Sequence, residues 1–350
     1  MRNLKRTLSL LLSFAMLIGM MVISASVVSY EDFTDADEIQ HTEAVSVLTT
    51  LNVIAGKDDG SYDPTGSLTR AKMAKIVAYV MNGGVEPNIG TKVTPTYSDI
   101  DGHWAESYIE YYTSMGIIAG DGAGRFNPEA TLTASQTARM FLTAMGYNAE
   151  VFGFVGNDWE INANRYANEA GLYNDLGGLI PSQPISRDIA AQMVYNAIQA
   201  YMMERDWSQD QTTGQITEGY RLSTTKTLLN ERFGVIKVEG VVTANEFTNG
   251  SSMSGKTQVD VTNYGSSLDQ DVFNDGRYNV SIGADEIGKN VTLYVKPYSN
   301  GNNNIFRATV LGGAIINDNN TVYTTTGALV DGLHQVQRRH RDPGRPGPGD

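Results

Sequence analysis

Basic side chains lie at two predicted helix starts, where they could bind an anion. Residues 69–72 read Thr-Arg-Ala-Lys, so a candidate N-cap precedes two cations, and Ser186-Arg187 repeats part of the arrangement. The first N–H groups of a helix lack partners within it, and with nearby cations they can hold a carboxylate or phosphate. The alternative is a solvated pair of charges on an exposed turn. On these residues alone the solvated pair is the preferred interpretation, and the context of the whole repeat decides whether Arg70, Lys72 and Arg187 are candidate anion ligands.

These helix starts belong to a unit that occurs three times. The clearest copy, residues 97–148, has Tyr-x-Asp, then Trp104, the run Gly-Ile-Ile-Ala-Gly ending at Gly120, a Gly-rich turn with Phe-x-Pro, and Leu-Thr before a second helix. A copy 64 residues earlier, residues 31–83, keeps the run that ends at Gly56. A more divergent copy at 152–202 keeps Trp159. Repetition at this period indicates stacked supersecondary units.

Each unit is predicted to form two helices that share one core. The second helices carry apolar residues at i, i+3, i+4 and i+7, which indicates one buried stripe per helix. The stripes are Ala74, Val77, Ala78 and Met81; Ala138, Phe141, Leu142 and Met145; and Ala191, Val194, Tyr195 and Ile198. The first helix of the middle unit is predicted to bury Trp104, Tyr108, Tyr112 and Met115 in the same way. One unit is too small to bury its own stripe, so the three are expected to pack together.

The order of these motifs resembles the S-layer homology (SLH) domain, which usually occurs as three tandem copies. The resemblance covers residues 31–202 and implies a pseudo-threefold helical bundle with clefts between adjacent repeats. It implies binding of a secondary cell-wall polysaccharide, often bearing pyruvate ketals, by the residues that match the family's Thr-Arg-Ala-Glu motif: Arg70, Lys72 and Arg187. The match is uneven, since Ala134 replaces the arginine in the second repeat, Lys72 replaces an acidic residue, and Gln40 stands where the family has tryptophan.

Aromatic residues and glycines complete the candidate site. Trp104 and Trp159 either fill the bundle core, the preferred interpretation, or form cleft walls against the apolar face of a sugar. Gly56 and Gly120 are expected to serve turns that need positive φ. The resemblance places the same turn at the border of the ligand cleft, which adds both glycines to the predicted ligand-binding residues.

The chain beyond the repeats changes in character. Residues 203–231 are polar without periodicity and are predicted to be an interdomain linker. Short alternating runs at 235–244, 259–261, 278–282, 291–295 and 306–310 predict an antiparallel β domain over 232–330, a sandwich or a barrel, with a hairpin tip at 300–304. Residues 331–350 are rich in Pro, Gly and Arg, and are either a basic interaction tail or, preferably, an artefactual terminus. The predicted fold class is multidomain α + β.

Composition limits the function classes. Residues 1–26 have the basic, apolar and small-residue regions of a secretory signal peptide, with a retained membrane anchor as the alternative. The 350 residues include four histidines and no cysteine. The absence of cysteine excludes thiol catalysis and Cys-based metal sites. A net charge of −13 argues against nucleic acid as a partner. The acidic turns fail the EF-hand pattern, so no cofactor is predicted and calcium stays a weak hypothesis.

The resemblance and the signal peptide together imply a secreted bacterial protein of the cell wall or S-layer, held noncovalently to the secondary cell-wall polysaccharide through its repeats. The β domain would then be displayed or would self-associate in a surface lattice. No catalytic motif is present, so the protein is predicted not to be an enzyme. Two alternatives stay open: an SLH-anchored wall enzyme whose catalytic domain lies outside this chain, and a protein–protein adaptor on the cell surface.

Overall fold

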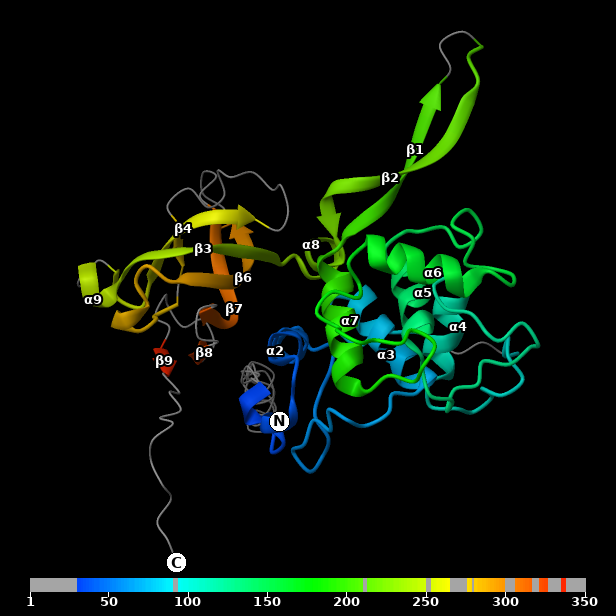
Figure 1. Cartoon of the computed structure of the whole chain (residues 1–350), viewed down its shortest axis with the longest axis horizontal. Helices are drawn as coiled ribbons and strands as arrows, with labels where there is room; N and C mark the ends of the chain where they lie inside the picture. Colours follow the sequence, from blue (N-terminus) through cyan, green and yellow to red (C-terminus); the bar gives the residue numbers. More distant parts are fainter. Residues whose placement is uncertain are drawn as a thin grey trace, which may run out of the picture.

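The computed structural model describes residues 30–90, 94–209, 213–249, 253–264, 276–278 and 280–299, and three further strands at 306–316, 321–326 and 335–337. A helical bundle and an antiparallel sheet lie side by side, and a long hairpin projects away from both (Figure 1). The predicted α + β class is confirmed. The predicted signal peptide lies outside the described residues. Within them, no helix is long and apolar enough to cross a membrane.

The bundle takes two helices from each repeat. The first helices are α2 (Thr42–Thr50), α4 (Glu106–Ser114) and α6 (Trp159–Glu169); the second are α3 (Arg70–Met81), α5 (Ala134–Ala144) and α7 (Arg187–Gln199). Two short 3-10 helices, η1 (Tyr30–Asp32) and η2 (Ala36–Glu38), precede α2. Each second helix begins after a hydroxyl N-cap, at Thr69, Thr133 or Ser186. Thr133 and Gln136 form the predicted capping box, so local sequence determines where these helices begin.

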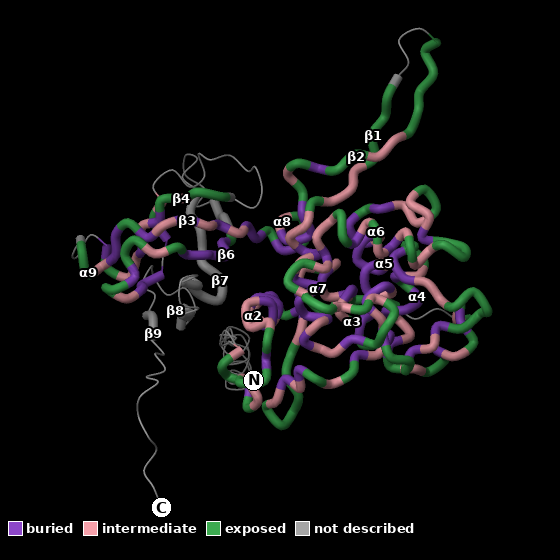
Figure 2. The backbone as a smooth tube through the Cα atoms, in the orientation of Figure 1, coloured by how far each residue is buried: buried purple, intermediate pink, exposed green. Residues whose placement is uncertain are grey.

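The core of the bundle is built from the predicted stripes of the second helices. Every stripe residue is buried except Met81, which is half-buried. Figure 2 shows this buried backbone running along α3, α5 and α7 at the centre of the bundle. The three repeats therefore share one hydrophobic core, as their individual size requires.

A closed ring of backbone contacts relates the three repeats. The segments before the second helices bridge one another in antiparallel fashion: Thr69 with Thr131, Thr133 with Pro184, and Ser67 with Ser186. Each repeat thus pairs with the other two at the same position in its sequence. This ring gives the bundle the pseudo-threefold arrangement that the family resemblance implied.

The predicted stripe of α4 is half wrong. Tyr108 and Tyr112 are buried, but Trp104 and Met115 are 53% and 50% exposed. The reason is that α4 spans only Glu106–Ser114, so Trp104 and Met115 fall in the turns that flank it. A helical period extended over these turns assigns them to the wrong face.

The segment predicted to be a linker is ordered. Strands β1 (Tyr201–Gln209) and β2 (Ile216–Thr227) pair as the projecting hairpin, and α8 (Leu228–Phe233) follows. Cross-strand ion pairs support it: Glu204 lies 3.0 Å from Arg221 and 2.8 Å from Lys226. Polar strands held by such pairs lack the apolar alternation that identifies a strand in a sequence.

The β domain is one antiparallel sheet in the order β5-β4-β3-β6-β7-β8-β9, a half-barrel rather than a closed barrel. Its strands are β3 (Ile236–Asn245), β4 (Thr257–Tyr264), β5 (Arg277–Tyr278), β6 (Asn290–Ser299), β7 (Phe306–Ile316), β8 (Thr321–Thr326) and β9 (Gln335–Gln337), with the short helices α9 (Glu246–Asn249) and η5 (Ala284–Glu286) between them. The strands predicted at 235–244, 259–261, 291–295 and 306–310 are confirmed, whereas the prediction at 278–282 is wrong, since β5 ends at Tyr278 and residues 280–282 form no strand. The predicted hairpin tip at 300–304 and most of 331–350 lie outside the described residues, but β9 pairs with β8 inside the predicted tail.

The sheet packs directly against the bundle. Glu43 of α2 accepts hydrogen bonds from the hydroxyls of Tyr195 on α7 (2.7 Å) and Tyr294 on β6 (2.8 Å). Burial raises the pKa of both tyrosines well above the usual range, so each remains a donor at neutral pH. Leu229 and Phe233 of α8 belong to the same core as the bundle. The two domains therefore form a continuous packed structure.

A histidine pair makes the stability of the bundle dependent on pH. His41, before α2, contacts Asp188 on α7 at 2.6 Å and the Asp175 carbonyl at 3.3 Å. The hydrogen bond to Asp188 raises the pKa of His41, against an opposing effect of burial. Stabilisation from a raised histidine pKa is complete below the unfolded value of about 6.5 and is lost as pH rises through the folded value.

We therefore expect the wild-type protein to lose stability relative to His41→Gln as the pH rises from 5.5 to 8.5. The glutamine keeps a polar side chain but cannot titrate in this range. Thermal unfolding of both proteins across this interval measures the difference. A difference in free energy that does not change with pH would contradict the pairing.

Candidate functional site

Arg70 is buried and links the first repeat to the second through hydrogen bonds. It is only 8% exposed, and its guanidinium donates from Nε to the Phe126 carbonyl and from Nη2 to the Ala119 carbonyl, each at 2.8 Å. The guanidinium also lies 4.4 Å from the centroid of the Phe126 ring. All three contacts are to the Gly-rich turn of the second repeat. This burial does not support the predicted direct contact between Arg70 and a ligand.

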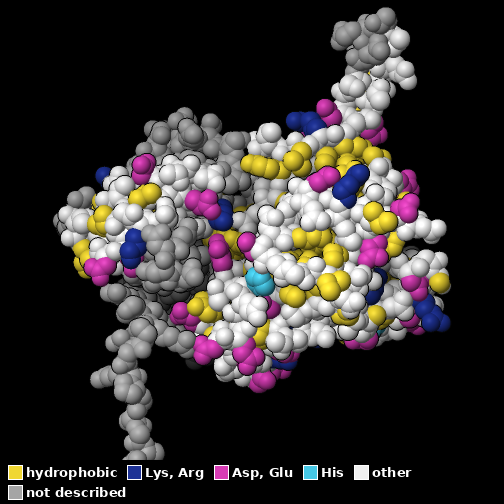
Figure 3. Space-filling view, viewed as in Figure 1, with side chains coloured by type: hydrophobic (Ala, Val, Ile, Leu, Met, Phe, Trp, Pro, Cys, Tyr) yellow, Lys and Arg dark blue, Asp and Glu magenta, His cyan; other side chains and the backbone are white. Residues whose placement is uncertain are grey.

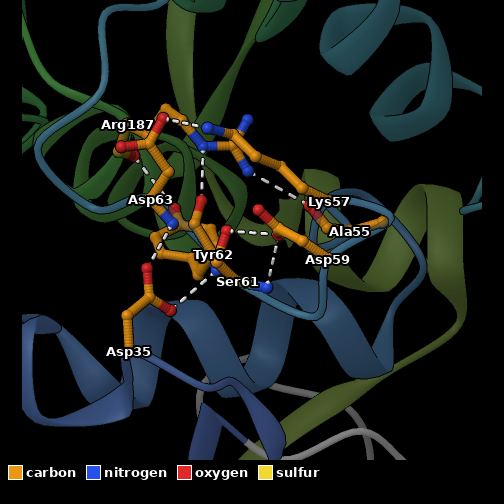
Figure 4. Close-up of polar contacts among 8 residues, drawn as sticks. All are labelled: Asp35, Ala55, Lys57, Asp59, Ser61, Tyr62, Asp63 and Arg187. Carbon is orange, nitrogen blue, oxygen red and sulfur yellow. Dashed lines mark hydrogen bonds and ion pairs between the residues drawn. The ribbon is translucent and has the colours of Figure 1, made fainter.

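Arg187 makes the equivalent contacts between the third and first repeats, in a more open setting (Figure 4). Its Nε donates to the Tyr62 carbonyl at 2.8 Å and its Nη2 to the Ala55 carbonyl at 3.1 Å. The guanidinium lies 4.8 Å from the centroid of the Tyr62 ring. Unlike Arg70, Arg187 is only half-buried and lines a cavity.

The helix-start amides that were predicted to bind an anion are already occupied. The amide of Arg70 donates to the Ala130 carbonyl at 3.0 Å, and that of Ala71 to the Pro128 carbonyl at 2.9 Å. The Lys72 amide donates to the Thr69 hydroxyl. The amide of Arg187 is bonded in the same way, to Gly66 of the first repeat. The prediction of free N–H groups at these helix starts is therefore wrong, because the neighbouring repeat supplies their acceptors.

Three basic side chains lie in one cavity, which we call the repeat-1 groove. Its volume is about 370 Å³. Its walls are the loop that follows α2 (residues 52–55), the outer face of α3, the exposed Trp104 and the start of α7. Lys72, Lys75 and Arg187 line it, with Tyr62 and Tyr79 among the aromatic residues. Within the part of the chain that the structure describes, neither lysine forms an ion pair. A cavity of this size with basic side chains and aromatic walls can hold an anionic, partly apolar ligand.

Hydrogen bonds hold the aromatic wall of this groove in place. The hydroxyls of Tyr79 and Tyr108 both donate to the Glu86 carboxylate. The bond to Glu86 raises the pKa of Tyr79 to about 12, so Tyr79 remains protonated at neutral pH. Lys75 Nζ lies 5.5 Å from the centroid of the Tyr79 ring. These contacts position Tyr79 and Lys75 together on one side of the groove.

The turn beside Arg187 is organised by carboxylates (Figure 4). Asp35 accepts 2.7 Å bonds from the amides of Tyr62 and Asp63, and Asp99 binds Phe126 and Asn127 in the second repeat. Lys57 contacts the Asp63 carboxylate at 2.5 Å and lowers the pKa of Asp63. The aspartate of the Phe/Tyr-x-Asp motif is therefore a structural residue, which explains its place in the repeat.

The two predicted tryptophans differ in their exposure. Trp104 lines the repeat-1 groove with more than half of its surface exposed, so the preferred core interpretation is wrong for this residue. Trp159 is half-buried and packs against the bundle core, as that interpretation predicted. Only Trp104 is brought together with the exposed cations in this groove.

The predicted glycines are required by close packing. A Cβ at Gly56 would lie 2.6 Å from the Phe33 ring, and one at Gly120 would lie 2.4 Å from the Tyr97 ring. The Gly120 amide donates to the Tyr97 hydroxyl at 2.8 Å. Positive φ was the wrong explanation for both residues, since their φ values are not in the left-handed region. A ligand contact by Gly56 or Gly120 stays a prediction.

Sequence reasoning missed Lys75 and Tyr79. Both follow Lys72 on α3 at helical spacing, three and seven residues later, and so share its face. That spacing was the available signal, since it extends the cationic face of Lys72 along the helix. Within the described ranges, no three His, Asp or Glu side chains are placed to hold a metal ion.

The sequence of this chain is similar to those of several known proteins. The family model of the S-layer homology domain matches residues 32–74 and 96–138, the first two repeats. An S-layer protein of Bacillus licheniformis is 27% identical over 236 residues, 65% of this chain and 26% of the relative. A cellulosome-anchoring protein of Acetivibrio thermocellus is 30% identical over 130 residues, 36% of this chain and 29% of that protein. An uncharacterized cell wall amidase of Bacillus anthracis is 28% identical over 159 residues, 45% of this chain and 29% of the amidase. The chain thus spans between a quarter and a third of the length of these relatives.

Proposed function

The chain is an SLH-domain protein homologous to S-layer proteins, and we propose that it is held at a bacterial cell surface by binding an anionic wall polysaccharide in the repeat-1 groove. The observation that carries the proposal is the convergence of Lys72, Lys75 and Arg187 with the exposed Trp104 in one cavity. We propose a binding rather than a catalytic role for this site.

The charge of the protein explains why short-range pairing must provide the affinity. The net charge is −13, and acidic side chains outnumber basic ones on the face shown in Figure 3. Long-range electrostatics therefore repel an anionic polymer. A carboxylate that enters the groove meets three cations within a cavity shielded from part of the solvent, where charge-assisted hydrogen bonds are strongest.

The proposed ligand is a sugar that carries a carboxylate, such as a pyruvate ketal. Such a unit presents a compact anionic group beside the apolar face of a pyranose ring. The cations suit the first feature, and the ring of Trp104 suits the second. A phosphate-bearing polymer would use the cations but would leave the aromatic wall without a role.

Trp104→Ala is expected to weaken wall binding about tenfold while leaving the fold intact. Stacking of this size corresponds to about 1.4 kcal/mol, and the exposed ring contributes little to the core. The binding isotherm on purified walls and the thermal unfolding curve measure the two effects. Trp207→Ala is the matched control, because Trp207 is 60% exposed on the hairpin, away from the groove. An equal loss in both variants would argue against a stacking role for Trp104.

Cosedimentation with protein-free cell walls tests the proposal as a whole. We expect the protein to pellet with intact walls and to stay in solution after chemical removal of the wall polysaccharide. Retention on walls stripped of the polysaccharide would refute polysaccharide anchoring and would favour another wall component or a protein partner.

A second candidate is an anchored wall enzyme, favoured by the similarity to the cell wall amidase. In that case the described repeats would have the same anchoring role and the catalysis would belong to another part of a longer protein. Release of soluble fragments from purified walls by this chain would support enzymatic activity within it. Walls that stay intact would leave the binding role.

A further inference from the structure

The projecting hairpin β1–β2 has two chemically different faces. Directly opposed residues of antiparallel strands share a face of the sheet, and the face alternates from one residue to the next along a strand. The register therefore gathers the large apolar side chains on one face, which we call the apolar hairpin face: Met203, Trp207, Ile216, Tyr220 and Leu222. The opposite face is polar, with Glu204, Asp206, Ser208, Thr217 and Arg221. Two charged residues, Arg205 and Glu218, interrupt the apolar face, so its character is clear only from the strand pairing.

The apolar hairpin face begins as a contact with the bundle and continues into solvent. At its base, the Tyr220 ring packs edge-to-face on the Phe152 ring of the bundle, with centroids 5.4 Å apart, and Met203 packs against the bundle core. Farther out, Trp207 and Ile216 are 60% and 64% exposed, on a part of the hairpin that projects away from both domains (Figure 1). Exposed apolar surface with a polar surround is typical of an interaction site, and a two-stranded hairpin alone is only marginally stable in water.

The charges of the hairpin favour a second copy of the chain as its partner. Residues 201–227 carry four acidic and three basic side chains, whereas the whole chain has a net charge of −13. The hairpin is therefore a nearly neutral part of an acidic molecule. A strand of nine residues spans about 30 Å, several times the Debye length of about 8 Å at physiological salt. Two copies joined through their outer hairpins thus keep their acidic bodies beyond the range of strong repulsion.

The apolar hairpin face is also complementary to itself. Contact about a two-fold axis requires that one patch match its own copy. Trp207 and Ile216 supply apolar surface to both sides of such a contact. Arg205 and Glu218 present opposite charges on the same face, 3.5 Å apart. A two-fold axis through this face brings each arginine toward the glutamate of the other copy, so charge and apolar surface both match.

We propose that the apolar hairpin face binds the same face of a second copy of this chain. Trp207 and Ile216 of each copy cover those of the other. A contact between two hairpin faces buries less than about 1,200 Å² in total, which places it among weak, reversible interfaces. It therefore joins molecules held at high local concentration and leaves a dilute chain monomeric. The inference locates self-association in the hairpin rather than in the sheet, and it does not depend on the repeat-1 groove.

Sedimentation velocity of the full chain, from about 1 µM to about 500 µM, tests the proposal in solution. We expect a reversible monomer–dimer equilibrium with Kd on the order of 100 µM. Trp207→Ser/Ile216→Ser should weaken it at least tenfold. Both residues are exposed, so the fold should survive, which thermal unfolding verifies. The matched control is Ser208→Ala/Thr217→Ala, an opposed pair on the polar face at the same height of the hairpin, which should change Kd less than twofold.

Amide hydrogen exchange locates the contact. At high concentration, protection should increase at 203–209 and 216–222 and stay constant in β3, β4 and β6. A chain that stays monomeric at the highest concentration would overturn the proposal and leave this face to a different partner. A dimer whose Kd is unchanged in Trp207→Ser/Ile216→Ser, or equally weakened in both double variants, would overturn it as well.

The dimer and the wall anchor can fail separately. Self-association is measured without walls, so failure of the cosedimentation test leaves this inference standing. Wall titrations run far below the expected Kd of the dimer, at low occupancy of the wall, where Trp207→Ala remains a valid control for Trp104.

Discussion

Replacing Lys72 and Lys75 together with alanine is expected to weaken wall binding about 30-fold or more. Charge-assisted hydrogen bonds contribute about 1.5–3 kcal/mol each, and loss of about 2 kcal/mol corresponds to roughly 30-fold in Kd. Both lysines are exposed on the same face of α3 and lack an ion pair within the described chain. Their positive charges are therefore available to a ligand. Binding isotherms on purified walls measure the change.

Arg165→Ala is the matched control for this prediction. Arg165 is exposed on α6, 3.7 Å from Glu169, and is absent from the lining of the repeat-1 groove. The control removes one positive charge from the same bundle and should change Kd less than twofold. A loss in Arg165→Ala comparable to that in the lysine variant would show that total charge rather than the groove governs binding.

Arg70→Ala is expected to destabilise the bundle by about 3 kcal/mol. The substitution removes two 2.8 Å bonds from a buried charged group and leaves the Phe126 and Ala119 carbonyls without that donor. It also removes the stacking of the guanidinium on the Phe126 ring. Denaturant unfolding followed by circular dichroism measures the free energy of unfolding.

Two comparisons separate stability from binding at Arg70. Arg70→Lys should recover little of the loss, since an ammonium cannot reproduce the planar fork that meets two carbonyls at once. Below the unfolding transition, the folded Arg70→Ala protein should bind walls as the wild type does. Normal stability with weakened wall binding would instead restore Arg70 as a direct ligand.

The sequence was sufficient to predict the repeats, the second helices and most of the sheet. The N-caps Thr69, Thr133 and Ser186 and the stripes that follow them are local signals, and local signals determine where a helix begins and which face it buries. The strands β3 and β6 were equally clear, because their β-branched runs alternate between buried and partly buried positions or lie wholly in the core.

The roles of the arginines could not be predicted in the same way. Arg70 and Arg187 occupy matching positions in the sequence, but their acceptors are carbonyls of the neighbouring repeat, and only the ring of three repeats brings them together. The same non-local packing leaves Arg70 buried and Arg187 half-exposed. The hairpin was missed for a related reason, since its ion pairs join residues on opposite strands.

The repeat-1 groove was predicted only in part. Lys72, Arg187 and Trp104 were named from the repeat motif. Lys75 and Tyr79 were identified only in the structure, where they lie on the outer face of α3 that lines the groove. Gly56 and Gly120 were assigned to positive φ, and the structure gives steric reasons instead, because aromatic rings of the same repeats lie against them. Such close approaches depend on tertiary packing that no local pattern reports.

The most direct test of the central claim is a cycle of four binding measurements. The wild type and the Lys72→Ala/Lys75→Ala variant are titrated on walls that keep their pyruvate ketals and on walls from which mild acid has removed them. If the lysines pair with the ketal carboxylate, the lysine substitution costs about 30-fold on intact walls and close to nothing on ketal-free walls, because either change alone removes the same interaction. An equal loss on both kinds of wall would show that the lysines act elsewhere and would contradict the groove as the site of ketal recognition.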